Sequence, residues 1–372
     1  MRRVAVQRKP GKLTPDYLLF GVTIALLCLG IVMVYSASSA RAYAQLGDAA
    51  FYLKRQVLWI IVGLVALYIT MHIDFHYWQR LAWPAMVFSL VSLVTVVLVG
   101  DVISGSKRWI DLGFFNFQPT ELTKLALVLF LSTFFSRLSK EKLSSFTKGF
   151  VPPLLWIGIT DLLIMLQPDF GSVVAISGVA FILLFTAGIP WGYLGLLAGA
   201  TIPALWGLAW AEPYRVRRLM AFLNPWADPS DTGYQTIQSL LALGSGGFFG
   251  LGLGQSRQKF SYLPANHTDF IFAILGEELG LLGTITVLAL FMVFAFRGFR
   301  IALKAPDFFG SLLATGLTSM IVFQAAMNIG VISGALPITG ITLPLISYGG
   351  SSLAITLASI GILLNISAHS AR

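Results

Sequence analysis

The chain has 372 residues, of which 56% are hydrophobic and only 11% are charged. An ordinary soluble domain has about 25% charged residues, so this composition excludes a soluble globular protein and indicates an integral membrane protein. The net charge of +9 arises mainly from basic residues between apolar stretches, and we expect no nucleic acid among its partners.

Ten apolar stretches are long enough to cross a bilayer, which takes roughly 20 apolar residues in a helix. The runs are continuous rather than alternating, which favours helices over barrel strands. The predicted fold is an all-α polytopic membrane protein with one membrane domain, 16–368, between a basic N-terminus, 1–15, and a short tail, 369–372. The expected spans are 16–36, 56–72, 82–100, 120–136, 150–166, 172–188, 193–210, 268–296, 308–333 and 351–368.

Basic residues predict the orientation of these spans, because Lys and Arg accumulate on the cytoplasmic side. Five of them precede the first span, in MRRVAVQRKPGK. With this end inside, cytoplasmic segments hold fourteen Lys and Arg and the short outer loops hold five. We therefore expect both termini in the cytoplasm, a first span that is not cleaved as a signal peptide, and a long extracytoplasmic loop, 211–267, between spans seven and eight.

Charged residues first gather in the outer loop 101–119 and at the start of the fourth span. The loop joins Gly and Ser to Lys107, Arg108 and Trp109, which is typical of a solvated loop with an interfacial tryptophan. Glu121 and Lys124 follow in PTELTKL, three residues apart, so they share a helix face and can pair. The pair is either a salt bridge at the helix end or lines a cavity, because intramembrane charges usually face the bundle interior or water.

A tight turn, QPDFG at 167–171, joins the fifth and sixth predicted spans, since Pro and Gly favour turns. Asp169 stands at the start of the sixth span. We expect it to cap that helix, as Asp does at many helix N-termini.

The loop 211–267 is far longer than the usual connection, which indicates a functional role. Near its start, Arg215, Arg217 and Arg218 form a cationic cluster. Arginine forks suit phosphate and diphosphate, so the cluster is either a substrate site or a binding site for lipid headgroups. We expect a short helix at 234–243. The glycine-dense run 244–256 follows it, and its glycines would let the backbone approach a ligand closely.

The stretch KFSYLPANHTDFIFAILGEELGLLG at 259–283 brings Lys259, His267 and Asp269 to the water-facing end of the eighth span. Asp269 is either the N-cap of that helix or a carboxylate available for chemistry. His267 is either a residue that orients a reacting group or an ordinary interfacial histidine.

The same span carries two acids and three glycines. Glu277 and Glu278 lie about two turns in, where a carboxylate is costly unless it is paired or faces water. We expect a flat edge of small residues on this helix, formed by Gly276, Gly280 and Gly283.

Polar residues return in span nine and in the last outer loop. Gln324 and Asn328 are four apart on one helix face, which is more typical of hydrogen bonds between helices than of ligands. The loop 334–352, GALPITGITLPLISYGGSS, alternates Pro and Gly with hydroxyls, and such backbone is tolerated at membrane depth only where protein or water satisfies it. We expect a cavity-lining segment, with Ser347 and Ser351 as candidate substrate-binding residues.

Taken together, these motifs resemble the SEDS family (shape, elongation, division and sporulation proteins), the FtsW/RodA/SpoVE group. The GEELG run and the NIGVISGALPITG stretch look closest to the division branch, FtsW. The pieces that match occur in family order and cover most of the chain: GSKRWIDLG, FQPTELTKLAL, QPDFGS, RRLMAFLNPWADPSDTGYQTIQSLLALGSGGFFGLGLGQS, KFSYLPANHTDFIFAILGEELGLLG and LPITGITLPLISYGGSS.

The resemblance implies a ten-span peptidoglycan glycosyltransferase in the bacterial cytoplasmic membrane. Its substrates would be lipid II, a disaccharide-pentapeptide on undecaprenyl diphosphate, and the growing glycan on the same carrier. The expected protein partner is a class B penicillin-binding protein. The family's catalytic aspartate falls on Asp269, and its functional charges fall on Arg108, Glu121 and Lys124.

The charged outer segments suit this chemistry. An acceptor sugar hydroxyl has a high pKa and needs a base, for which Asp269 is the candidate, and inversion needs no covalent nucleophile. The leaving diphosphate needs cations or a divalent metal such as Mg²⁺ or Mn²⁺. The candidate substrate-binding residues are Arg108, Glu121, Lys124, Arg215, Arg218, Lys259, His267, Ser347 and Ser351.

Two other functions compete with this prediction. Buried acids and broken helices also suit a transporter that moves lipid II across the bilayer, although the sequence has no clear inverted repeat. The third hypothesis is a scaffold that only recruits the penicillin-binding protein. A transporter would not make glycan from lipid II already presented outside, and a scaffold would tolerate the loss of Asp269.

Overall fold

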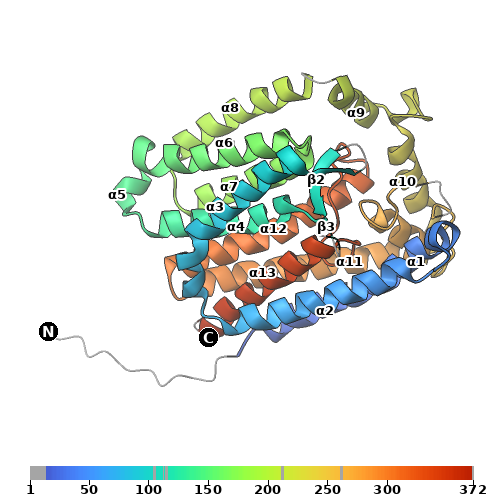
Figure 1. The fold of residues 1–372 in the computed structure, drawn as a ribbon, viewed down its shortest axis with the longest axis horizontal. Helices are drawn as coiled ribbons and strands as arrows, with labels where there is room; N and C mark the ends of the chain where they lie inside the picture. Colours follow the sequence, from blue (N-terminus) through green and yellow to red (C-terminus); the bar gives the residue numbers. More distant parts are fainter. Residues whose placement is uncertain are drawn as a thin grey trace.

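In a computed structural model the chain folds into a bundle of long helices, with a small sheet and short helices at one end (Figure 1). The structure describes residues 14–370 except 104–105, 112, 114–115, 211–212 and 260–262. It describes the backbone alone at 101–103, 106, 202, 204–206, 208–209 and 213–215.

Ten long helices in the described part of the chain lie at the positions of the ten predicted spans, which confirms a polytopic helical membrane fold. Over the described residues, seven of them are long and apolar enough to cross a membrane by length and composition. The ten are α1 (Tyr17–Leu46), α2 (Phe51–His72), α3 (Phe75–Val99), α4 (Pro119–Ser136), α6 (Val151–Met165), α7 (Phe170–Thr186), α8 (Trp191–Trp210), α11 (Ile271–Lys304), α12 (Phe308–Ile332) and α13 (Gly350–His369).

The all-α prediction missed structure in the outer segments. The loop 101–119 contains a three-stranded antiparallel sheet with β2 in the middle: β1 (Asp101–Ile103), β2 (Ser106–Asp111) and β3 (Asn116–Phe117). The long loop opens with α9 (Pro213–Leu223), which the sequence did not predict, and η2 (Pro225–Ala227) follows. The predicted short helix is confirmed as α10 (Tyr234–Ser245). At the opposite end, α5 (Lys140–Leu143) and η1 (Phe146–Phe150) join α4 to α6.

The bundle is centred on α12, whose mostly buried residues pack against α4, α7 and α11. Close to it, α2 packs along α13, and small residues let these helices approach closely. A Cβ added at Gly361 would lie 2.4 Å from the main-chain oxygen of Leu67, and Thr70 Oγ1 donates to the oxygen of Ala358 at 2.9 Å. The outer faces of α1, α2 and α3 instead expose large apolar side chains, as expected where helices face lipid.

Helix α11 is broken at Gly280, which has φ 64° and ψ −160°. The carbonyls of Glu277 and Glu278 accept hydrogen bonds from the N–H groups of Leu251 and Gly252, both at 3.0 Å. The glycine-rich run therefore approaches the backbone of α11 closely. Gly280 permits the close approach expected of the predicted small-residue edge, because a Cβ there would clash with the backbone of Gly250 and Phe248. The sequence did not predict its positive φ, which other residues rarely adopt.

The start of α1 and the end of α13 meet at one end of the bundle. Asp16 Oδ2 accepts a hydrogen bond from Arg297 Nε at 2.8 Å, and the N–H of Asp16 donates to Ser367 Oγ at 2.9 Å. The sheet, α9 and α10 lie at the other end of the bundle (Figure 1). The segments with predicted site residues therefore gather at the end of the bundle opposite the start of α1 and the end of α13.

Candidate active site

A cavity of about 1420 Å³ lies at the end of the bundle that carries the sheet. Its wall combines β2 and α9 with the first turns of α2 and α4, the segment before α11, and the loop between α12 and α13. Typical small-molecule pockets hold about 300–1,000 Å³, so this cavity suits a large substrate. Six of the predicted site residues line it: Arg108, Glu121, Lys124, Arg218, His267 and Asp269.

Asp269 lies directly before α11 and lines the cavity. It does not cap the helix, because the N-cap is Phe270 and no side chain makes a cap hydrogen bond there. The capping alternative is therefore wrong. Burial raises the pKa of Asp269 to about 6, while the charges of Arg108 and Arg218 lower it and that of Asp169 raises it. A carboxylate with this pKa can act as a base near neutral pH.

The backbone that carries Asp269 is fixed by three hydrogen bonds. The main-chain oxygens of residues 267–269 each accept from a different donor. The donors, in order, are Tyr348 N at 3.0 Å, Ser347 Oγ at 2.6 Å and Asn328 Nδ2 at 2.7 Å. Ser347 thus holds this backbone rather than lining the cavity, and Asn328 links α12 to the start of α11, as predicted for a hydrogen bond between helices.

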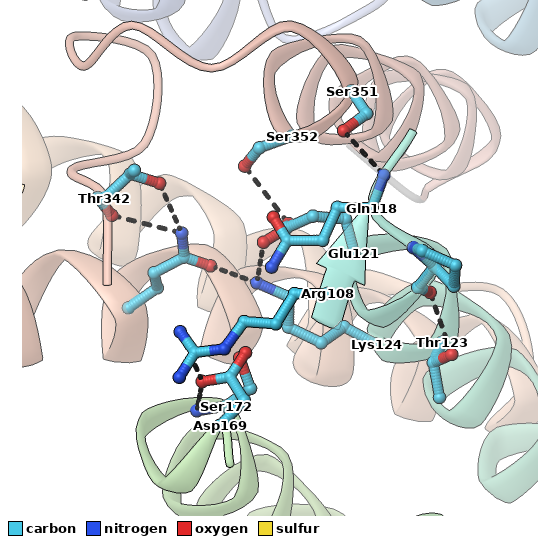
Figure 2. Close-up of polar contacts among 12 residues, drawn as sticks. Arg108, Gln118, Glu121, Thr123, Lys124, Asp169, Ser172, Thr342, Ser351 and Ser352 are labelled. Carbon is cyan, nitrogen blue, oxygen red and sulfur yellow. Dashed lines mark hydrogen bonds and ion pairs between the residues drawn. The ribbon is translucent and has the colours of Figure 1, made fainter. Parts of the chain in front are cut away.

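Arg108 and Asp169 form one side of the cavity (Figure 2). Arg108 Nη1 lies 3.8 Å from Asp169 Oδ1, and Arg108 Nε donates to the oxygen of Gln167 at 3.2 Å. Asp169 also accepts from the N–H of Ser172 at 3.2 Å and from its hydroxyl at 2.8 Å. The predicted cap of the sixth span is confirmed, and the same carboxylate anchors Arg108 close to Asp269.

Glu121 and Lys124 form a buried pair on the cavity wall, with 2.8 Å between Nζ and Oε1 (Figure 2). Lys124 Nζ also donates to Gln324 Oε1 at 2.7 Å, and Ser352 Oγ donates to Glu121 Oε2 at 3.1 Å. Ser351 Oγ instead accepts a hydrogen bond from the N–H of Gln118, the residue before α4, at 3.4 Å, and Ser351 does not line the cavity. Sequence reasoning missed Ser352, because the GGSS run alone does not reveal which serine faces inward.

His267 packs against Tyr52, with ring centroids 4.5 Å apart, and its Nδ1 lies 3.0 Å from Asn266 Oδ1. Burial, with the charge of Arg41, lowers the pKa of His267 to about 4. The imidazole is therefore neutral at pH 7. It can orient a group by hydrogen bonding, but it contributes no positive charge.

The arginine cluster of the long loop divides in the structure. Arg218 lines the cavity and donates from Nη1 to the oxygen of Ile338 at 3.3 Å. Arg217 is exposed and lies off the cavity wall. The side chain of Arg215 is outside the described residues, so its predicted role stays a prediction.

Lys259 is buried away from the cavity wall. Its Nζ lies 3.5 Å from Glu278 Oε1 and also donates to the oxygen of Gly254. Glu278 accepts a hydrogen bond from Ser36 Oγ on α1 at 2.7 Å. Lys259 therefore offsets a buried carboxylate, because a charge is buried at tolerable cost only when it is paired.

Glu277, which is 1% exposed, faces the same segment. Its carboxylate accepts from the N–H groups of Arg257 at 3.0 Å and Gln258 at 3.3 Å, and from the Ser256 hydroxyl. The two acids thus tie residues 256–259 to α11, just ahead of the stretch that carries Asp269. Their burial is explained by these partners, not by contact with water.

Comparisons with known proteins show which family the chain resembles. The family model of the FtsW/RodA/SpoVE group, described as "Cell cycle protein", matches residues 16–372. The chain is 46% identical to "Stage V sporulation protein E" of Bacillus subtilis (strain 168), across 96% of this chain and 98% of the relative. It is 42% identical to "Probable peptidoglycan glycosyltransferase FtsW" of Geobacter sp. (strain M18), across 95% of this chain and 96% of the relative.

Solved structures share the fold. A chain from "Structural coordination of polymerization and crosslinking by a peptidoglycan synthase complex" superposes with a TM-score of 0.79 at 32% identity, covering 94% of this chain and 97% of that one. The rod shape determining protein RodA of Thermus thermophilus superposes with a TM-score of 0.71 at 30% identity, covering 95% of this chain and 96% of that one.

Proposed function

The chain belongs to the FtsW/RodA/SpoVE family of cell cycle proteins, the SEDS family, and we propose that it is a peptidoglycan glycosyltransferase. Its substrate is lipid II, which it polymerises into glycan strands at the outer face of the bacterial cytoplasmic membrane. Both termini then lie in the cytoplasm, and the cavity opens on the outer side.

The observation that carries this proposal is the environment of Asp269. Its carboxylate lines a cavity large enough for a glycan, it caps no helix, and its pKa is raised by burial to about 6. Arg108 and Arg218 stand close enough for their charges to act on it. A base beside two cations is what glycosyl transfer from a diphosphate requires.

In the proposed reaction, the Asp269 carboxylate takes the proton of an acceptor sugar hydroxyl. The hydroxyl oxygen bonds to the anomeric carbon of the donor while the bond from that carbon to the diphosphate breaks. The electron pair leaves with the diphosphate, whose charge Arg108 and Arg218 neutralise. A single base and a direct displacement predict inversion at the anomeric carbon.

The predicted divalent cation fits this site only with help from the substrate. Among the described residues, no group of three or more His, Cys, Asp or Glu side chains is placed to hold a metal ion. Mg²⁺ is commonly bound through one or two carboxylates together with substrate phosphates. A Mg²⁺ or Mn²⁺ ion would therefore take most of its ligands from the diphosphate and add positive charge there. Chelation followed by restoration of either ion tests this requirement.

The proposed partner is a class B penicillin-binding protein, which would crosslink the new strands. A similar chain comes from a structure described as a peptidoglycan synthase complex that combines polymerisation and crosslinking, which supports this proposal. Lipid II and the glycan on undecaprenyl diphosphate enter from the membrane.

The test is polymerisation by the purified protein. Lipid II is supplied with and without the penicillin-binding protein, whose own crosslinking is blocked, and glycan chains are separated by length. Wild type should make chains, and Asp269→Asn purified in parallel should make none, which also controls for contaminating polymerase. Movement of lipid II across liposomes without synthesis would favour the transporter. Normal growth of cells that carry only Asp269→Asn would favour the scaffold.

A further inference from the structure

The cavity has more cations than its acids can balance. Two of its three acids are paired, Glu121 with Lys124 and Asp169 with Arg108. Among the described residues, no carboxylate lies within ion-pair distance of Arg41 or Arg55. The charged side chains that line the cavity are Arg41, Arg55, Arg108, Lys124, Arg218, Glu121, Asp169 and Asp269.

Arg41 of α1 and Arg55 of α2 both line this cavity. The charge of Arg41 acts on His267 and that of Arg55 on Tyr348, and the rings of these two residues lie 5.8 Å apart. The Arg55 guanidinium stacks on the Phe51 ring, 4.6 Å from its centroid, and lies close enough to Tyr348 for its charge to act on that hydroxyl. Arg41 Nε donates to Gln45 at 3.3 Å. These contacts hold both side chains in place while leaving their positive charges available to an anion.

This pair is separate from the cations near the proposed base. The charges that act on Asp269 are those of Arg108 and Arg218, whereas the charge of Arg41 acts on His267. In Figure 1, α9 lies along the upper edge, and α1 and α2 lie along the lower edge. The cavity therefore has two cation pairs. Arg108 and Arg218 act on Asp269, whereas Arg41 and Arg55 act on His267 and Tyr348, whose rings lie 5.8 Å apart.

The chemistry of polymerisation needs two such cation pairs, because both reactants are attached to lipid diphosphates. In the donor, the reacting carbon is bonded directly to the diphosphate, so the donor's cations must border the base. In the acceptor, sugar separates the reacting hydroxyl from the diphosphate, so the acceptor's cations must lie farther away. The cavity volume, above the usual range for one small ligand, leaves room for both headgroups.

We propose that Arg41 and Arg55 form a second lipid-diphosphate site, which holds the diphosphate of the acceptor. Arg108 and Arg218 hold that of the donor. This assignment rests on the proposed function and names which cations serve which reactant. Arginine is suited to both places because its fork binds phosphate oxygens in pairs.

A binding experiment tests the site without relying on turnover. The probe is undecaprenyl diphosphate, which carries no sugar, and bound lipids per chain are counted by native mass spectrometry. Wild type should bind two, and the double variant Arg41→Gln with Arg55→Gln should bind one. The matched control is Lys54→Gln, because Lys54 is a neighbouring cation whose side chain is 70% exposed and pairs with Asp48 off the cavity wall. The control should still bind two.

Several outcomes would overturn the proposal. These are one bound lipid in wild type, two in the double variant, or the same loss in the Lys54→Gln control. A parallel titration with phosphatidylglycerol separates a diphosphate site from a general headgroup site. If the double variant loses only the binding of phosphatidylglycerol, the two arginines form a general headgroup site. This result would also overturn the proposal. Should the double variant fail to fold, the single variants carry the test, each expected to weaken the second site about tenfold or more.

A kinetic arm links the site to synthesis. Lipid II turnover by the double variant should show KM raised about tenfold or more, with kcat closer to wild type. A wild-type protein that binds two lipids but makes no glycan would refute the proposed function and leave the site standing. An active wild type whose double variant keeps its KM would refute the acceptor site alone.

Discussion

The side-chain amide of Asn328 donates a 2.7 Å hydrogen bond to the main-chain oxygen of Asp269. The same amide donates to the oxygen of Ile341, also at 2.7 Å. One side chain at the end of α12 therefore joins the segment before α11 to the loop before α13. This places the proposed base on a backbone that is held by the buried centre of the bundle.

Asn328→Leu keeps the size of the side chain and removes both hydrogen bonds. Two carbonyls lose their donor, and the segment that carries Asp269 should shift. Because a misplacement of about 1 Å can cost about a hundredfold in rate, kcat for glycan synthesis should fall about tenfold to a hundredfold. Initial rates at saturating lipid II measure this effect.

Asn365→Leu is the matched control for that variant. Asn365 is also buried, donates to the oxygen of Met71 at 2.7 Å and accepts from the N–H of Phe75 at 3.0 Å, but it lies at the end of the bundle away from the cavity. Both variants should lose thermal stability, and only Asn328→Leu should lose rate. Equal rates in the two would reduce Asn328 to a structural role.

The buried pair of Glu121 and Lys124 predicts a double-mutant result. Removing one partner of a buried pair costs about 3–5 kcal/mol, whereas replacing both by uncharged residues is often neutral. Lys124→Met should therefore lower the melting temperature and the activity. Adding Glu121→Gln should restore the melting temperature while activity stays low, since the cavity has lost both charges.

The exposed pair of Lys54 and Asp48 controls for the loss of any ion pair. Its side chains are 70% and 41% exposed, and such pairs contribute about 0–1 kcal/mol, so Lys54→Met should change little. Full polymerase activity in the double variant at 121 and 124 would show that the pair serves the fold alone.

The helices were predictable from the sequence because each span is a continuous apolar run, and length alone distinguishes it from a loop. The break at Gly280 was not, because it depends on the glycine-rich segment 247–252 meeting α11 far along the chain. α9 was missed for a different reason. Its eleven residues are too few for a span, and three arginines interrupt its apolar residues.

The sequence was enough to predict which charged residues belong to the candidate site in some cases. It did not reveal which way a charged side chain faces in the folded protein. Glu121 and Lys124 were candidates because intramembrane charges usually face the bundle interior or water, whereas the resemblance to the family singled out Arg108 and Asp269. Lys259 is also a charged residue near the membrane, but in the structure its Nζ lies 3.5 Å from Glu278 Oε1 and not on the cavity wall. Arg41 and Arg55 were not predicted as site residues, since nothing in the local sequence shows that α1 and α2 place them on the cavity wall.

Asp269→Asn should separate catalysis from folding. Loss of a general base costs about 10²–10⁴ in rate, so glycan synthesis should become undetectable or nearly so. Stability should not fall, because the side chain caps no helix. Folding raises the pKa of this acid from 3.8 to about 6, so ionisation destabilises the wild type as pH rises from about 4 to about 6. Asp269→Asn has no ionisable group at this position, so it should not lose stability in this way as the pH rises.

The measurement is a pair of melting curves with a partner-binding assay. At pH 7.5 the variant should melt at or above the wild-type temperature, and near pH 3.5 the two should coincide, since the acid is then protonated in both states. It should still bind the penicillin-binding protein. A variant that melts well below wild type at pH 7.5 would assign Asp269 to the fold.

The pH profile of synthesis gives the last prediction. A base must be deprotonated to accept a proton, so kcat/KM should fall on the acid side with a midpoint near pH 6 rather than near 4. Arg108 lowers the pKa of Asp269 and Asp169 raises it. Arg108→Gln should therefore move the midpoint to higher pH. Asp169→Asn should move it to lower pH, and Asn still caps α7.

Opposite shifts are the decisive feature, because general damage to the protein would not move two midpoints in opposite directions. Arg217→Gln is the matched control, since Arg217 is exposed and lies off the cavity wall, and its midpoint should stay at the wild-type value. Initial rates at low lipid II across about pH 4.5 to 8.5 provide the profiles. Midpoints that move together, or a rate that is flat down to the lowest pH, would mean that Asp269 does not accept the proton.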